Sequence, residues 1–216
     1  MTPDRRKLLL GLPATLAGLA PWSGVPAEEP PPAHAGKGEP LPWQDRALID
    51  PATRRRIRLR LRLPGAGTDQ AWGERRPLIV YSPGLGSGLS NGAAWSEAWR
   101  QAGLVVATLA HPGTDEGIWD TSERSLSANL AAALAPSQYG HRVSDCRHAI
   151  RQCLTAMGLE AIIDPARIGI AGHSYGALTV QSLAGQAARR QDGFTIAGAI
   201  ALSPGGRSPA VGGGPR

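Results

Sequence analysis

The chain has 216 residues and a formal net charge of +6 at pH 7, with 28 glycines and 19 prolines. This length suits one domain with a substantial core and leaves too little sequence for two. Much of the positive charge lies in six arginines between residues 54 and 62. They alternate with Ile57, Leu59 and Leu61, which predicts a strand with one solvated face at an edge of the sheet. No aromatic residue is interleaved for base stacking, so we expect no nucleic-acid partner.

Residues 1–27 have the three parts of an export signal. Arg5 and Arg6 precede an apolar run from residue 8 to residue 20, and small residues end the segment at Ala27. The paired arginines resemble a twin-arginine signal, with a Sec signal as the alternative. We therefore expect a bacterial protein that is exported to the periplasm or secreted. The apolar run is too short to span a bilayer comfortably, so no stable membrane span is expected.

The composition divides the rest of the chain into three parts. Residues 28–42 are rich in proline and alanine and predict a disordered leader, whereas residues 43–204 predict a folded α/β domain. Strands that alternate with helices at this spacing form a mostly parallel sheet with helices on both faces. The predicted strands cover residues 56–63, 77–82, 104–109, 168–171 and 194–202, and the predicted helices cover residues 93–102, 125–134, 139–157 and 177–190.

The two cysteines, Cys146 and Cys153, are seven residues apart in the predicted helix 139–157. Two helical turns separate them by roughly 10 Å, which is too far for a disulfide within that helix. They share an apolar face with Val143 and Ile150. The cysteines are therefore predicted to be core residues, and no metal site is expected.

The segment from Ile168 to Leu178, IGIAGHSYGAL, has the pattern of a nucleophile elbow. A buried strand turns through Ser174 into a helix rich in small residues, which predicts a serine hydroxyl exposed at the carboxyl edge of the sheet. Glycines on both sides of the serine are needed because a Cβ there would collide with neighbouring backbone. Ser174 is therefore the predicted nucleophile, and His173 beside it is a predicted substrate-binding residue.

A nucleophilic serine needs amide donors for the oxyanion that forms when it attacks. One predicted donor is the N–H of Tyr175, the residue after the nucleophile. The other is the N–H of Leu85, in the glycine-rich loop after strand 77–82. Gly84 and Gly86 let this loop approach a substrate closely and are predicted to line the binding site. A phosphate-binding loop is disfavoured because no lysine follows in the required position.

Three motifs in this order, YSPGLGSG, AHPG and DPARIGIAGHSYGA, resemble the α/β-hydrolase superfamily. Within it, the chain is similar to bacterial predicted dienelactone hydrolases and to serine esterases that resemble platelet-activating factor acetylhydrolase. The resemblance covers residues 43–204 and implies a carboxylesterase with Ser174 as nucleophile and no metal or organic cofactor. The chain departs from the pattern at Pro83, where relatives commonly have histidine, and at Ala110, where they often have aspartate.

The acid and the histidine of the catalytic triad are missing from their usual place. In this fold both follow the serine in the chain, but no histidine follows Ser174 and the only later carboxylate is Asp192. Residues 205–216 form an irregular tail with a composition typical of a shifted reading frame in GC-rich DNA. We therefore expect a truncated hydrolase that lacks its last strands and helix. His111 ends a strand at the active-site edge and is predicted to line the pocket, with a role as substitute base as the alternative.

The sequence thus favours ester hydrolysis through an acyl-enzyme on Ser174. The expected partner is a small ester or lipid substrate, and the oligomeric state stays open. Two alternatives share the same fold. One is a non-catalytic pseudo-hydrolase that binds an ester or lipid, and the other is a thioesterase or peptidase that uses the same elbow.

Overall fold

The computed structural model describes residues 43–65, 75–187 and 193–205. The export signal and leader predicted for residues 1–42, and residues 206–216 of the predicted tail, lie outside the described residues. No helix in the described part of the chain is long and apolar enough to cross a membrane.

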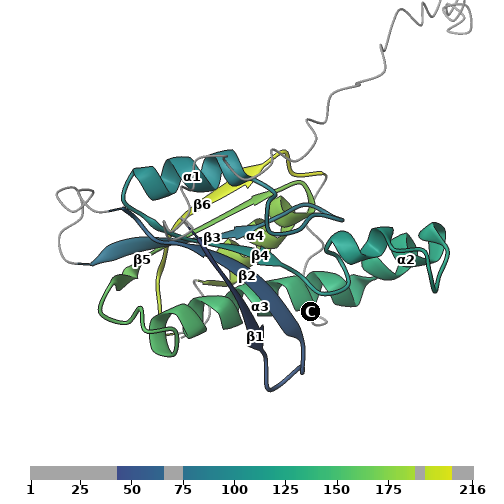
Figure 1. Cartoon of the computed structure of the whole chain (residues 1–216), viewed down its shortest axis with the longest axis horizontal. Coiled ribbons are helices and arrows are strands. Elements are labelled where there is room, and N and C mark those ends of the chain that lie inside the picture. Colours follow the sequence, from purple (N-terminus) through teal and green to yellow (C-terminus); the bar gives the residue numbers. More distant parts are fainter. Residues whose placement is uncertain (1–42, 66–74, 188–192, 206–216) are drawn as a thin grey trace, which may run out of the picture. The chain divides into compact units, whose positions relative to one another are not determined.

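A sheet of six strands, in the order β1-β2-β4-β3-β5-β6, runs through the centre of the described residues (Figure 1). The four strands β4, β3, β5 and β6 are parallel to one another, whereas β2 is antiparallel to both of its neighbours. This arrangement confirms the mostly parallel sheet predicted from the sequence. The strands are β1 (Gln44–Ile49), β2 (Arg56–Arg62), β3 (Arg76–Ser82), β4 (Val105–Ala110), β5 (Ile163–His173) and β6 (Ile196–Leu202).

Helices cover both faces of this sheet, as predicted (Figure 1). The helix α3 (Pro136–Thr155) packs on one face together with α4 (Tyr175–Ala187), and α1 (Ala93–Gln101) packs on the other. Proline at the first position of α3 suits a helix start, because that residue's N–H has no intrahelical acceptor. A shorter helix, α2 (Leu126–Ala133), follows a single 3-10 turn at Glu116–Trp119.

The main core lies between the sheet and the face shared by α3 and α4. Every residue of β3 and β4 is buried, as expected for inner strands of a parallel sheet that is covered on both sides. Cys146 and Cys153 are free thiols buried in this core, which confirms the packing role predicted for them. Burial raises the pKa of each thiol to about 12, so both stay protonated near neutral pH.

The prediction that residues 56–63 form an edge strand is wrong. Strand β2 is an inner strand, because β1 pairs along its whole length and forms the edge instead. The alternating arginines find partners within the protein: Arg60 binds Asp45 at 2.8 Å, and Arg58 binds Glu116 at 2.6 Å. Arg62 is buried and donates to the hydroxyl of Thr108 at 3.2 Å. Most of these arginines therefore bind groups on neighbouring elements instead of forming an open basic face.

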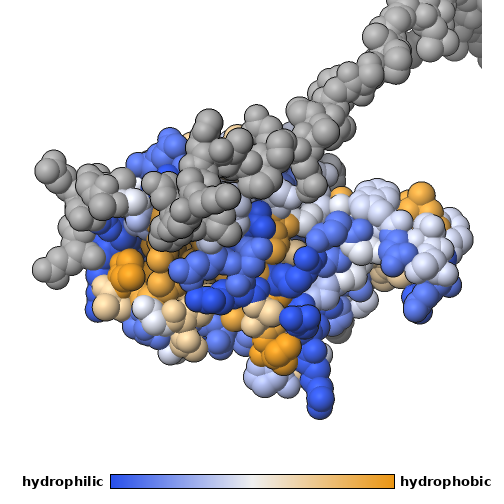
Figure 2. Space-filling view, viewed as in Figure 1, coloured by the Kyte–Doolittle hydropathy of each residue, from blue (hydrophilic) through white to orange (hydrophobic). Residues whose placement is uncertain are grey.

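Strand β6 forms the opposite edge and, among the described residues, pairs only with β5. Its sequence, IAGAIAL, is apolar, yet its central residues are exposed and Ile200 is 42% exposed. In Figure 2 the face in view is mostly hydrophilic, with apolar side chains exposed between the charged ones. An apolar strand with an open edge offers backbone groups for pairing with further polypeptide.

Candidate active site

The strand, turn and helix predicted around Ser174 are present in the structure. Strand β5 ends at His173, α4 begins at Tyr175, and Ser174 lies between them with φ at +53°. A positive φ is strained for a residue with a Cβ, and such strain is characteristic of functional turns. The amide of Ser174 donates to the carbonyl of Leu202 at 2.9 Å, which ties the turn to the end of β6. The side chain of Ser174 is exposed.

Two glycines allow this turn to pack against the end of β3. A Cβ added to Gly176 would lie 2.7 Å from the carbonyl oxygen of Pro83 and would overlap the carbonyl of Ser82. A Cβ added to Gly172 would lie 2.8 Å from the Ser82 oxygen. Contacts this short would force the backbone to move. The glycines on either side of Ser174 are therefore required for the close approach of β5, α4 and β3.

The loop after β3 lies beside Ser174 and is held at Gly86. A Cβ built on Gly84 would lie 3.7 Å from the Cβ of Ser174, so the loop passes next to the elbow. Gly86 has φ at +70°, its amide donates to the carbonyl of Thr114 at 2.9 Å, and its carbonyl accepts from Trp119 Nε1 at 2.7 Å. The structure thus brings the predicted loop and the predicted nucleophile together.

Both predicted oxyanion donors are unengaged. Within the described part of the chain, the amides of Leu85 and Tyr175 donate no hydrogen bond. Tyr175 is the first residue of α4, and the first amides of a helix have no intrahelical acceptor. The positive end of the helix dipole also lies there, which favours an anion at this position. The arrangement can stabilise negative charge beside Ser174.

Two exposed tryptophans flank the elbow and its loop. Trp95, on α1, is 42% exposed, and its ring centre lies 6.2 Å from that of His173. Trp119 is 54% exposed, and its ring lies against Gly86. Both side chains therefore offer apolar surface next to residues predicted to bind substrate.

His111 lies in a different environment from the exposed elbow. Its ring is completely buried, with Nδ1 2.9 Å from Asp145 Oδ2 and Nε2 3.0 Å from the hydroxyl oxygen of Ser82. Arg55 donates two hydrogen bonds to the carboxylate of Asp145, each at 2.9 Å. Among the described residues, His111 therefore bonds to two buried groups, Ser82 and Asp145, and not to Ser174.

The protonation states of this buried cluster follow from its surroundings. Burial, reinforced by the nearby charge of Arg142, lowers the pKa of His111 to about 4, so the ring is neutral near pH 7. Burial alone would raise the pKa of Asp145, but hydrogen bonds from His111 and Arg55 hold it below its ordinary value. An ionised Asp145 only accepts, so Nδ1 of His111 carries the proton and Nε2 accepts from the Ser82 hydroxyl.

Ser82, His111 and Asp145 therefore have the hydrogen-bond order of a serine hydrolase triad. Ser82 is only 1% exposed, however, and its hydroxyl also accepts from Arg142 at 3.0 Å. A buried hydroxyl with both roles occupied cannot reach a substrate in this arrangement. The cluster joins the ends of β3 and β4 to the middle of α3.

Sequence analysis did not find most members of this cluster. Ser82, Asp145 and Arg142 each contribute a buried polar side chain, and Arg55 was assigned only to a solvated run. One signal was available: Arg142 and Asp145 are three residues apart on a predicted helix, so their side chains lie on the same face of that helix. In the described residues, the hydroxyl of Ser174 makes no hydrogen bond.

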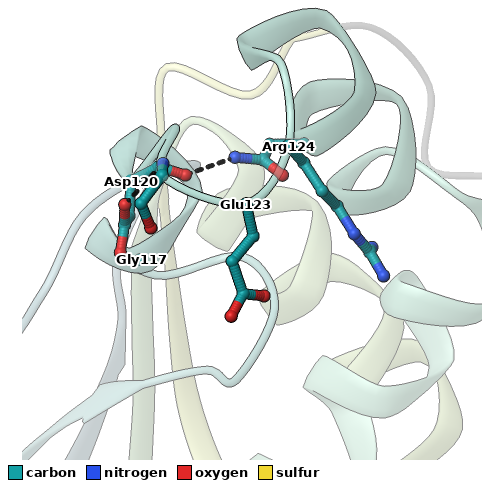
Figure 3. A pocket seen from close by; sticks show the side chains of 6 residues that line it. Gly117, Asp120, Glu123 and Arg124 are labelled. Atoms are coloured by element: carbon teal, nitrogen blue, oxygen red, sulfur yellow. Dashed lines mark hydrogen bonds between the residues drawn. The ribbon is translucent and has the colours of Figure 1, made fainter.

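A polar pocket of about 370 Å³ lies between the 3-10 turn and α2 (Figure 3). Glu123 and Arg124 extend from the same loop in different directions, and Asn129 donates to the carbonyl of Asp120 at 2.7 Å. This pocket does not include Ser174. Its lining residues are Gly117, Asp120, Ser122, Glu123, Arg124 and Asn129.

No protein-family model and no curated protein sequence matches the chain. Solved structures do match it in fold. The structure of esterase Est22 aligns with a TM-score of 0.52 and 19% identity, over 75% of this chain and 43% of that one. The ferulic acid esterase from Streptomyces cinnamoneus aligns with a TM-score of 0.50 and 21% identity, over 72% of this chain and 58% of that one. The chain has the α/β-hydrolase fold.

A dienelactone hydrolase from Anabaena variabilis also aligns, with a TM-score of 0.48 and 16% identity, over 74% of this chain and 63% of that chain. The chain thus spans less than two thirds of the length of these proteins. At such identities the likeness concerns the hydrolase fold, and the activity of each protein named belongs to that protein.

Substituting Gly176 should unfold the elbow, whereas the same change later in α4 should not. Gly176→Ala forces a Cβ onto the carbonyl of Ser82, so we expect a loss of several kcal/mol in unfolding free energy, measured by urea denaturation. Gly185→Ala is the matched control because nothing lies within 4 Å of its added Cβ, and a helical alanine gains up to about 1 kcal/mol. Equal stability of the two variants would contradict the packing described for the elbow.

His111 should make the protein less stable as the pH falls. Its folded pKa of about 4 lies below the unfolded value near 6.5, so the unfolded chain binds more protons between these values. The unfolding free energy should fall by on the order of 3 kcal/mol from pH 6.5 to pH 4. His111→Gln removes this titration and should flatten the slope in that window. A wild-type slope in the variant would show that another group is responsible.

Proposed function

We propose that the protein is a serine hydrolase that cleaves carboxylic esters through an acyl-enzyme on Ser174. The observation that carries this proposal is the exposed serine at a strained turn beside two unengaged amides. The Ser174 oxygen attacks the carbonyl carbon, the hydroxyl proton passes to a base, and the oxyanion is held by the amides of Leu85 and Tyr175. The alcohol then leaves with a proton, and water hydrolyses the acyl-enzyme to release the acid.

None of the described residues supplies the base in this arrangement. The hydroxyl of Ser174 makes no hydrogen bond there, and Nε2 of His111 is occupied by Ser82. A pKa of about 4 also makes His111 a weak proton acceptor near neutral pH. We therefore propose a base that lies outside the described residues.

The lack of a base among the described residues favours a second candidate, a pseudo-hydrolase that binds an ester or lipid without turning it over. The oxyanion donors and the flanking tryptophans would serve binding equally well. Thioesterase or peptidase chemistry on the same elbow differs only in the leaving group. Turnover of matched p-nitrophenyl esters, thioesters and peptides separates these activities.

Ser174→Ala should abolish both covalent labelling by a fluorophosphonate and any ester turnover, because it removes the attacking oxygen. Labelling is located by peptide mass spectrometry, and turnover is measured with p-nitrophenyl acetate. Ser127→Ala is the control, since this exposed serine lies on α2 away from the elbow, and it should behave as wild type. Absence of wild-type labelling would contradict the proposal and favour the pseudo-hydrolase, because a serine without a base is not activated to attack the phosphonate.

The exposed tryptophans lead us to propose an ester with an aromatic or bulky apolar group. A ring stacked on Trp119 gains about 0.5–1.5 kcal/mol, or about 2- to 10-fold in rate. Trp119→Ala removes the hydrogen bond to Gly86 for both reagents, so the readout is the ratio of the two rates: labelling by an aryl phosphonate should slow by this factor more than labelling by a methyl phosphonate. Ile49→Ala is the control, because Ile49 is 59% exposed on β1, and it should affect neither reagent. An equal effect of Trp119→Ala on both reagents would rule out a subsite there.

A further inference from the structure

We propose that Arg142 is the positioning residue of the oxyanion hole, holding the backbone on both sides of Ser174 so that the amides of Leu85 and Tyr175 point to one place. This role rests on the proposed function. It concerns a buried side chain on α3 that does not touch the substrate.

Arg142 first fixes the loop that carries Leu85. Its Nη2 donates to the carbonyl of Pro83, two residues before Leu85, and to the hydroxyl of Ser82 at 3.0 Å. Its Nη1 donates to the hydroxyl of Thr114 at 2.6 Å, and the carbonyl of Thr114 accepts from the amide of Gly86. The backbone is therefore tied to this guanidinium both before and after Leu85.

Arg142 also fixes the start of α4. Its Nε donates to the hydroxyl of Thr179 at 3.1 Å, and that hydroxyl donates to the carbonyl of Tyr175 at 3.2 Å. The guanidinium carbon lies 4.7 Å from the centre of the Tyr175 ring, within the range of a cation–π contact. One side chain thus contacts the two segments that supply the predicted donors.

The chemistry of the guanidinium suits this position. Arginine presents five N–H donors in a planar fork, and four different oxygens accept from it here. Burial lowers the pKa of Arg142 to about 10, which still leaves it ionised near pH 7. Lysine cannot reproduce this geometry because its donors radiate from a single nitrogen.

Arg55 offers a control that separates a positioning role from a general effect on stability. It belongs to the same cluster, since it forms two hydrogen bonds to Asp145 and a third to the carbonyl of Pro112. None of these bonds goes to the Leu85 loop or to α4. A substitution of Arg55 should therefore destabilise the cluster without moving the oxyanion donors.

The test compares Arg142→Lys with Arg55→Lys in the full chain. The readouts are melting temperature and the kinetics of fluorophosphonate labelling at Ser174, separated into the maximal rate and the half-saturating concentration. We expect Arg142→Lys to lower the maximal rate by about tenfold or more, with the half-saturating concentration unchanged, because the donors act on charge in the transition state. Arg55→Lys should lower the melting temperature and keep the maximal rate within about threefold of wild type.

A second variant keeps the test decisive if Arg142→Lys does not fold. Thr179→Val keeps the side-chain shape and removes the hydroxyl that links Arg142 to the Tyr175 carbonyl, so it should lower the maximal rate by a smaller factor. If the wild type is labelled but the Arg142 or Thr179 variant has the same maximal rate as the Arg55 variant, the positioning role is overturned and the proposed function stands. A wild-type chain that is not labelled would overturn the proposed function and this role with it.

Discussion

The structure around the site depends on one constraint, the burial of charged side chains from α3 beneath the carboxyl ends of the strands. Arg142 and Asp145 are both fully buried, and a buried charge without partners is strongly unfavourable. Each is satisfied by groups from several elements: Asp145 by His111 and Arg55, and Arg142 by oxygens from β3, the loop after β4, and α4. Removing Arg55 would leave the buried charge of Asp145 without an opposite charge, which typically costs about 3–5 kcal/mol. Hydrogen bonds to buried charged side chains therefore help to hold the loops at this edge of the sheet.

Burial also distinguishes Ser82 from Ser174, the two serines with features of a hydrolase nucleophile. Ser82 has a histidine and an aspartate in hydrogen-bond sequence, yet it is buried and its hydroxyl is fully used. Ser174 has no such partners among the described residues, yet it is exposed on a strained turn beside unengaged amides. Burial also makes His111 a poor proton acceptor by lowering its pKa. Exposure and backbone geometry, rather than the presence of a Ser–His–Asp chain, identify the serine that can meet a substrate.

Much of the fold could be predicted because its determinants are local. Apolar runs and the glycines around Ser174 each act on their own segment, so the inner strands and the elbow followed from the sequence. Strand β1, QDRALI, was missed because its first three residues are polar and its pairing with β2 includes the ion pair of Asp45 with Arg60. The buried cluster was missed for a related reason. Its bonds join residues 60 positions apart, as for Arg142 and Ser82, and no local pattern reports such a pairing.

In the proposed mechanism, the oxyanion hole is formed without the base. The predicted donors and Ser174 lie directly after β3 and β5, and Arg142 contacts both segments from α3. A base would add proton transfer to this arrangement without changing its geometry, if Arg142 and the glycines of the elbow position the amides as we propose. Electrostatic stabilisation and proton transfer are therefore structurally separable in this chain. Electrostatic stabilisation would come from the sheet and its buried charges. Proton transfer would depend on the proposed base outside the described residues.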